Sequence, residues 1–188
     1  MFKKQFAAIL LAVLVMATLG NAKEIGGINM PESLKTGQTT LMLNGAGVRK
    51  KFFVDVYVGG LYLREKSQDS KAIIAADEPM AIRLHIVSSM VTSKKMEKAW
   101  REGFEKATGG NIEPIKFQIE ELISVFREEI KENDSYDMIY VPGKGVQVFK
   151  NNESRPTIGG LPFKKALFGI WLSDKPAQKS LKKAMLGQ

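Results

Sequence analysis

Arg49 and Tyr57 are the two residues whose types and spacing could form a binding site for a carboxylate. They lie eight positions apart in the most β-rich part of the chain, so they share one face of a regular strand. A guanidinium binds both oxygens of a carboxylate, and a phenol hydroxyl donates to one of them. An inward-pointing Arg49 needs an anionic partner, because burying an unpaired charge is very costly. The alternative is an exposed Arg49 at the end of a strand, beside Lys50 and Lys51.

Other familiar kinds of chemistry are missing from the sequence. The chain has no cysteine, which excludes disulfides, thiol catalysis and thiolate metal sites. Its one histidine, His85, would need carboxylates as all further ligands of a zinc ion, so we expect a partly buried, hydrogen-bonded residue instead. The segment 45–47 (GAG) lacks the further residues of a phosphate-binding loop, and there is no G-x-S-x-G motif. We therefore expect neither a metal nor a cofactor.

The charge of the chain is moderately positive. Its 28 Lys and Arg residues outnumber 20 Asp and Glu residues, which gives a formal net charge of +8. The basic residues are spread along the sequence and alternate with acids, as in residues 94–106 and 127–131. This distribution indicates solvated faces rather than a nucleic-acid-binding surface. It supports only a modest preference for anionic partners.

Residues 1–22 have the features of a signal peptide. Lys3 and Lys4 precede an uncharged apolar run at 6–19, and residues 20–22 (GNA) have the small side chains of a cleavage site. The run is shorter than the ~20 residues that a membrane span needs. The alternative is an uncleaved N-terminal helix that tethers the protein to the inner membrane. We expect an exported, periplasmic protein, a monomer whose single domain is residues 23–188 and has no membrane span.

The remaining sequence favours an α+β fold, in which helices cover an antiparallel sheet. A polar lead-in precedes the first expected strand, and residues 44–47 are expected to form a turn. The expected strands are 39–43, 48–63 (one long strand or two joined ones), 80–88, 136–141, 146–150 and 157–160. The expected helices are 67–76 (a short helix or a loop), 93–108, 115–132, 162–171 and 177–186. Gly59 and Gly60 would mark a bulge or a close backbone approach.

Three segments resemble the chalcone isomerase family. LNGAGVRKKFFVDVYVGGLYL at 43–63 is similar to the opening β segment of that family. YVPGKGVQVFKNN at 140–152 and IGGLPFKKALFGIWLSDKPAQKSLKKAMLG at 158–187 are similar to its bacterial chalcone isomerase-like branch. The likeness covers nearly all of residues 23–188. It implies an open-faced β-sandwich, in which a helical layer covers a large antiparallel sheet with a cleft between them.

The catalytic residues of the plant enzymes carry over only in part. The catalytic Arg of the family falls on Arg49, and the Thr of the following strand falls on Tyr57. The active-site Tyr falls near Thr92, the helix Asn near Ala99 and the late Ser or Thr near Gly169. The resemblance therefore implies that the acid-base and water-holding groups of chalcone cyclisation are missing.

Non-catalytic, fatty-acid-binding relatives of the same fold are a better match. In those proteins the Arg of the GxGVR motif and a Tyr of the VYxxGLY strand hold the fatty-acid carboxylate, and these positions fall on Arg49 and Tyr57. The resemblance thus implies a protein that holds a fatty acid or a similar apolar carboxylate between sheet and helices. The candidate wall residues are Phe53, Trp100, Phe104 and Phe168.

Two other functions stay open at this point. One is a lyase or isomerase acting on a small phenolic or enone substrate, with Arg49 as electrophile and Tyr57 as acid. The other is an interaction protein that has lost its cavity. A cleft filled by side chains, with Arg49 paired to an internal carboxylate, would indicate the latter.

Overall fold

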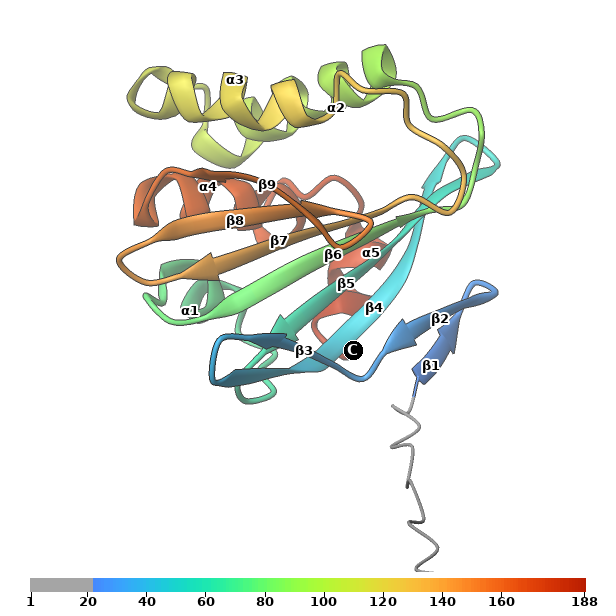
Figure 1. Cartoon of the computed structure of the whole chain (residues 1–188), viewed down its shortest axis with the longest axis horizontal. Helices are drawn as coiled ribbons and strands as arrows, with labels where there is room; N and C mark the ends of the chain where they lie inside the picture. Colours follow the sequence, from blue (N-terminus) through green and yellow to red (C-terminus); the bar gives the residue numbers. More distant parts are fainter. Residues whose placement is uncertain (1–21) are drawn as a thin grey trace, which may run out of the picture.

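The computed structural model describes residues 22–188, and a seven-stranded antiparallel sheet is its largest element. The strands follow one another in the sheet in the order of the sequence (Figure 1). They are β3 (Ser33–Thr36), β4 (Thr39–Lys51), β5 (Val54–Leu63), β6 (Met80–Ile86), β7 (Ser135–Val141), β8 (Gly145–Lys150) and β9 (Glu153–Ile158). This meander confirms the expected α+β class and antiparallel sheet.

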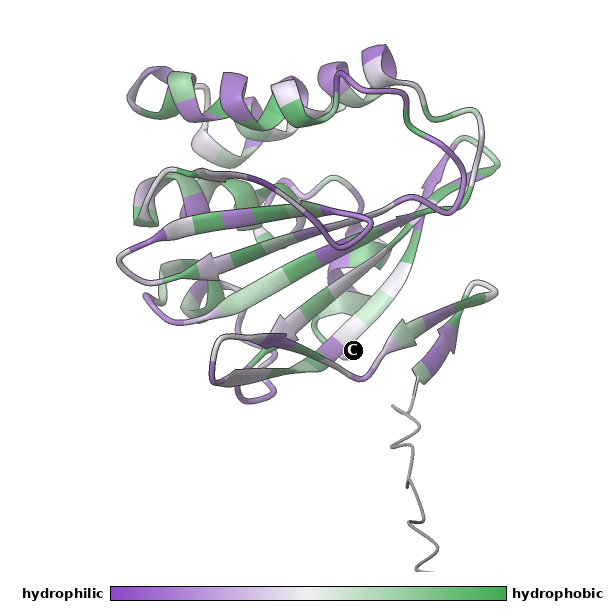
Figure 2. Ribbon diagram, viewed as in Figure 1, coloured by the Kyte–Doolittle hydropathy of each residue, from purple (hydrophilic) through white to green (hydrophobic). Residues whose placement is uncertain are grey.

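Helices cover one face of this sheet and bury the main core against it. Alternate residues of β6, such as Ile82, Leu84 and Ile86, lie in this core together with Trp100, Phe104 and most of α4. Figure 2 shows the resulting alternation of hydrophobic and hydrophilic residues along the strands. The helices are α1 (Ser70–Ala75), α2 (Ser93–Thr108), α3 (Lys116–Val125), α4 (Leu161–Leu172) and α5 (Lys179–Met185), and a short 3₁₀ turn at Glu113–Ile115 precedes α3.

The ends of α2 follow the signals in the sequence. The Thr92 side chain accepts a hydrogen bond from the Lys95 amide at 3.3 Å, which caps the helix at its start. Gly109 adopts a left-handed conformation with φ 64° and ends the helix. These two caps explain why the predicted bounds of this helix agree with the structure.

A smaller apolar cluster lies on the opposite face of the sheet. A two-stranded ribbon, β1 (Ala22–Ile25) and β2 (Ile28–Pro31), contributes Met30 to this cluster, which also contains Val58 and Tyr62. A Cβ on Gly60 would lie 2.6 Å from the Met30 methyl carbon, so a larger residue here would displace the flexible Met30 side chain. Within residues 22–188, Gly59 and Gly60 show neither the expected bulge nor a close approach of another backbone segment, because both pair regularly in the sheet and their near neighbours are side chains.

Three expectations about the elements were wrong. Residues 44–47 are not a turn: β4 runs through them, with a bulge at Asn44. The polar lead-in contains β1, β2 and β3, because polar strands with one exposed face lack a clear apolar signal. The helix expected at 115–132 ends at Val125, and tertiary hydrogen bonds compete with its continuation: the carbonyls of Glu128 and Glu129 accept from Ser93 and Lys150 instead.

The segment 48–63 was expected to form one long strand or two joined ones, and the structure shows two. Its division at Phe52 and Phe53 makes β4 and β5 a hairpin.

The expected signal peptide lies outside the described residues, apart from Ala22. Within residues 22–188, no helix is both long and apolar enough to cross a bilayer.

Candidate functional site

A β-bulge decides which face of the sheet Arg49 occupies. Leu41 and Leu43 lie in the cluster on the ribbon side, and strict alternation would place Arg49 there as well. Asn44 is an extra residue of β4, between the pairs Leu43–Tyr62 and Gly45–Leu61. The extra residue shifts the alternation by one, so Arg49 lies on the helical face.

The side chain of Asn44 holds this bulge in place. Its Nδ2 donates to the Ser67 and Met185 carbonyls, both at 2.9 Å, and its Oδ1 accepts from the Ser67 amide at 2.8 Å. Beside the bulge, a Cβ on Gly45 would lie only 2.1 Å from the Ala184 carbonyl oxygen, so glycine lets α5 pack directly on β4. Asn44 therefore forms the bulge, and the glycine that follows it allows the helix contact.

Arg49 and Tyr57 are direct partners across the β4–β5 hairpin. Sequence reasoning expected them on one face of a single strand; the hairpin instead places them side by side on neighbouring strands. A second bulge adds Val56 between the pairs Arg49–Tyr57 and Lys50–Asp55. As a result, Val56 and Tyr57, although consecutive, both line the cavity described below.

Arg49 is positioned by an amide side chain, and the residues that the structure describes offer it no acidic partner. Its Nη1 donates to the Gln178 Oε1 at 2.9 Å and also to the Lys50 carbonyl. Gln178 is itself held, since its Nε2 donates to the Val48 carbonyl at 3.2 Å. Among residues 22–188 no carboxylate lies within salt-bridge distance of Arg49. The guanidinium thus keeps its positive charge uncompensated by the part of the chain described.

The hydroxyl of Tyr57 is buried and ready to donate. It accepts a hydrogen bond from the Trp171 indole at 3.0 Å, and no bond found within residues 22–188 uses its own hydrogen. Burial raises the pKa of Tyr57 above its ordinary value, and the hydrogen bond from Trp171 and the charge of Arg49 offset only part of this rise. At neutral pH the phenol is therefore neutral and can donate to an anion.

Arg49 and Tyr57 line a cavity of about 470 Å³ between the sheet and the helices. This volume falls within the range of ~300–1,000 Å³ common for small-molecule sites. The walls are mainly apolar and come from β5, β6, α2 and α4, with Val56, Leu84, Met96, Trp100, Ile170 and Trp171 among them. Gly103 lets α2 approach α4 here, because a Cβ at this position would lie 3.0 Å from Ile170.

The six residues predicted for the site do not all meet at the cavity. Arg49, Tyr57 and Trp100 line it. Phe104 and Phe168 are completely buried in the core and are absent from its walls. Phe53 is fully exposed at the tip of the β4–β5 hairpin and is also absent from the walls. The aromatic side chains at 104 and 168 fill the space between elements, whereas Phe53 lies in the turn, where no second layer covers it.

Several residues of the site were missed by sequence reasoning. Gln178 and Trp171, which contact Arg49 and Tyr57, come from the last quarter of the chain. The sequence around Trp171 indicates only the apolar side of a helix, and the sequence around Gln178 indicates only a loop between helices. No local signal therefore links either residue to the hairpin. Trp100, which was predicted, has a further property: its indole Nε1 is buried and finds no acceptor within the described residues. Trp100 itself lines the same cavity as Arg49 and Tyr57.

The positions aligned with the enzyme's other catalytic residues offer no reactive group to the cavity. Thr92 is exposed and caps α2. Ala99 lines the cavity with a methyl group. Gly169 packs against Ala107, 3.1 Å from where its Cβ would be. None of these three positions therefore supplies an acid-base group beside Arg49 and Tyr57.

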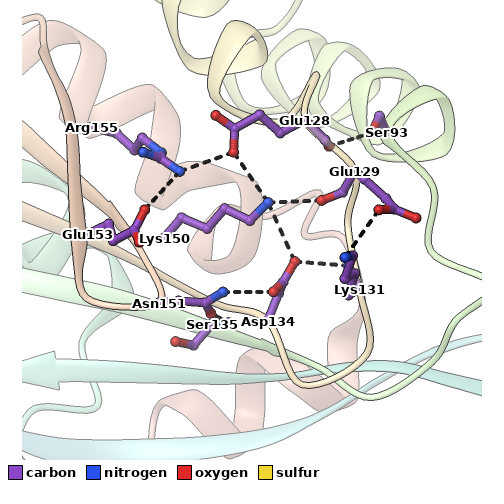
Figure 3. Close-up of polar contacts among 10 residues, drawn as sticks. All are labelled: Ser93, Glu128, Glu129, Lys131, Asp134, Ser135, Lys150, Asn151, Glu153 and Arg155. Atoms are coloured by element: carbon purple, nitrogen blue, oxygen red, sulfur yellow. Dashed lines mark hydrogen bonds and ion pairs between the residues drawn. The ribbon is translucent and has the colours of Figure 1, made fainter.

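A second, polar hollow lies where β8 and β9 meet the segment after α3 (Figure 3). The Lys150 ammonium donates to the Glu129 carbonyl at 2.9 Å and lies 3.6 Å from the Asp134 carboxylate. Glu128 accepts from Arg155 at 3.0 Å. Burial alone would raise the pKa of Asp134, but hydrogen bonds from Asn151 and the Lys131 amide, with the charge of Lys150, outweigh it and hold the pKa below its usual range.

The charged groups of this cluster pair with one another, and only the buried Nε of Arg155 lacks an acceptor among residues 22–188, so we assign the cluster a structural role. It closes the irregular segment between α3 and β7 onto the sheet. Within residues 22–188 no group of three or more His, Cys, Asp or Glu side chains is placed to hold a metal ion.

Comparisons with known proteins agree with this architecture. Residues 22–187 match the family described as chalcone isomerase-like, and the chain belongs to that family. Among solved structures it is similar to a fatty-acid binding protein of Arabidopsis thaliana, with a TM-score of 0.67 and 19% sequence identity over 85% of this chain and 92% of the other. At this identity the likeness establishes a shared fold. No curated protein sequence matches the chain.

Proposed function

We propose that this protein is an exported, non-catalytic binding protein for a fatty acid or a similar apolar carboxylate. The observation that carries the proposal is the cross-strand pair of Arg49 and Tyr57 at a largely apolar cavity, with no carboxylate of residues 22–188 paired to Arg49. An interaction protein without a cavity would have shown the opposite arrangement. The Arabidopsis protein of the same fold, described as fatty-acid binding, adds support from a relative.

The head group would be held by charge-assisted hydrogen bonds. Gln178 fixes Nη1 of Arg49, which leaves Nη2 and Nε for the ligand oxygens. Tyr57, whose raised pKa keeps it protonated, donates to one of the same oxygens. The tail would lie between Val56, Leu84, Met96 and Ile170. Removing its methylenes from water supplies affinity in proportion to the buried apolar area.

The isomerase alternative lacks support from the cavity walls. General acid-base chemistry needs a group that exchanges protons near the working pH. Burial moves the pKa of Tyr57 away from neutral, and Ala99 adds no polar atom. A chalcone assay gives a direct check: turnover that disappears in Arg49→Ala would favour the enzyme over the binding protein.

Binding is tested by mass spectrometry of lipids extracted from the purified protein, followed by titration with a fluorescent fatty acid. Arg49→Gln should weaken binding by about 10- to 100-fold, the effect of losing a charged hydrogen-bond partner, and Tyr57→Phe should weaken it by about fivefold. Arg127→Gln is the matched control, because Arg127 is exposed and lies outside the cavity.

The methyl ester of the fatty acid is a control ligand that tests whether the carboxylate is recognised. It keeps the tail but lacks the charge, so it should bind wild type and Arg49→Gln alike. The proposal fails if protein from cells carries no such lipid and Arg49→Gln binds fatty acids as wild type does.

A further inference from the structure

The rim of the cavity has unusually exposed apolar side chains. Phe52 and Phe53, at the tip of the β4–β5 hairpin, are 89% and 101% exposed, and Met90, in the loop between β6 and α2, is 56% exposed. Phe52 and Met90 both line the cavity. In Figure 1 the tip of the β4–β5 hairpin and the loop between β6 and α2 lie at the same end of the molecule. Single exposed apolar residues are common, but adjacent ones at a protruding tip indicate an interaction surface.

The backbone conformation at the hairpin tip is unfavourable for a phenylalanine. Phe52 adopts φ 57°, in the left-handed region that glycine and asparagine occupy most easily. A bulky aromatic residue here raises the energy of the folded state and buries nothing. Neither the core nor the turn geometry therefore explains the two phenylalanines, and an external partner does.

The charges of the rim are almost all positive. Six basic side chains and one acidic side chain, Glu102, are among the residues lining the cavity. Lys98 pairs with Glu102 at 3.8 Å. The exposed Lys51, Lys95 and Lys175 have no carboxylate within 4 Å among residues 22–188. Lys95 also donates to the Met90 carbonyl at 3.0 Å, and the positive charges of the rim favour an anionic partner surface.

We propose that this rim, formed by Phe52, Phe53, Met90, Lys51, Lys95 and Lys175, docks the protein on an anionic lipid bilayer. The aromatic rings enter the boundary between headgroups and acyl chains, and the ammonium groups contact lipid phosphates, the usual division of roles in interfacial anchors. A bilayer suits these side chains because it accepts protruding rings without a matching pocket and offers phosphates all around them. The cavity opening then faces the membrane surface.

Docking would also explain how the ligand reaches the cavity. This explanation rests on the proposed fatty-acid binding, whereas docking itself does not. A fatty acid could pass between the bilayer and the cavity without crossing water, where its tail is poorly hydrated. Docking itself needs no ligand, so the two proposals fail separately.

The test measures co-sedimentation of the ligand-free protein with vesicles of phosphatidylcholine alone or with 30% phosphatidylglycerol, a fraction chosen as about that of a strongly anionic membrane. Residues 22–188 are used, because they contain every helix and strand that the structure describes and both apolar clusters, while the apolar run at 6–19 could insert into vesicles by itself. We expect binding to the anionic vesicles that is at least about tenfold stronger and that weakens with salt.

Phe53→Ser should reduce binding to anionic vesicles by about tenfold, the effect of one lost buried ring. Phe117→Ser is the matched control, because Phe117 is also exposed, at 72%, but lies on α3 away from the rim. Lys51→Gln with Lys175→Gln should cost about fivefold per lysine, whereas Lys71→Gln with Lys144→Gln, two exposed lysines elsewhere, should not.

Fatty-acid affinity of Phe53→Ser in solution, without vesicles, should equal that of wild type, since Phe53 is not in the cavity wall. The docking proposal is overturned if wild type ignores anionic vesicles, including the case in which the rim binds an acidic protein instead. It is equally overturned if Phe117→Ser loses as much binding as Phe53→Ser.

Discussion

Replacing Asn44 with alanine would remove the side chain that holds the bulge of β4. This bulge places Arg49 on the helical face of the sheet. The change deletes two donated hydrogen bonds of 2.9 Å and one accepted bond of 2.8 Å. Asn44 is only 8% exposed, so water replaces these bonds poorly. At roughly 1 kcal/mol per net hydrogen bond, with the Met185 carbonyl left unpaired, we expect the free energy of unfolding to fall by about 3 kcal/mol.

Urea unfolding of residues 22–188, followed by tryptophan fluorescence, measures this effect. With a denaturant slope of roughly 2 kcal/mol per molar, the midpoint should fall by about 1.5 M. Asn111→Ala is the matched control: Asn111 is exposed, and no side-chain hydrogen bond of it is found within the described chain. Its midpoint should change by no more than about 0.2 M.

Asn44→Asp sharpens the test. It keeps the acceptor for the Ser67 amide but places a carboxylate against two carbonyl oxygens, so at neutral pH it should destabilise at least as much as alanine. Fatty-acid affinity of Asn44→Ala without urea should fall as well, because Arg49 loses its fixed face. Equal midpoints for Asn44→Ala and Asn111→Ala would refute the role of this side chain.

Three further predictions concern stability and the cavity. Lys164→Met should lower the free energy of unfolding by about 3 kcal/mol, because the ammonium of this fully buried lysine donates to three carbonyls at the end of α1, whereas the exposed Lys165→Met should not. Asp134→Ala should destabilise by about 3 kcal/mol at pH 7. The pKa of Asp134 is lowered in the folded state, so its contribution to stability is fully present above the ordinary pKa and is lost as pH falls through the folded value. The urea midpoints of wild type and variant should therefore begin to approach each other as pH falls below about 4. Ala99→Phe, which enlarges a cavity-lining side chain, should weaken fatty-acid binding in the fluorescence titration, whereas Glu105→Phe, on the same helix outside the cavity, should not.

Much of the fold was predictable because local signals mark its elements. Alternation along 80–88 and helix caps at Thr92 and Gly109 agree with β6 and α2. The end of α3 was not predictable, since the carbonyl of Glu128 accepts from Ser93, 35 residues away. The wall residues were predicted from aromatic character alone. That character does not separate Trp100, at the cavity, from Phe104 in the core or Phe53 in solvent.

The sequence by itself determined the family and the two residue types suited to a carboxylate. Local chemistry carries this information, because a guanidinium and a phenol have the same hydrogen-bonding capacity wherever they lie. Tertiary structure alone decided that Arg49 faces the helices, through the Asn44 bulge, and that Tyr57 is its neighbour, through the hairpin. It also decided that Gln178 and Trp171 hold the pair, because contacts between distant segments depend on packing that no local pattern encodes.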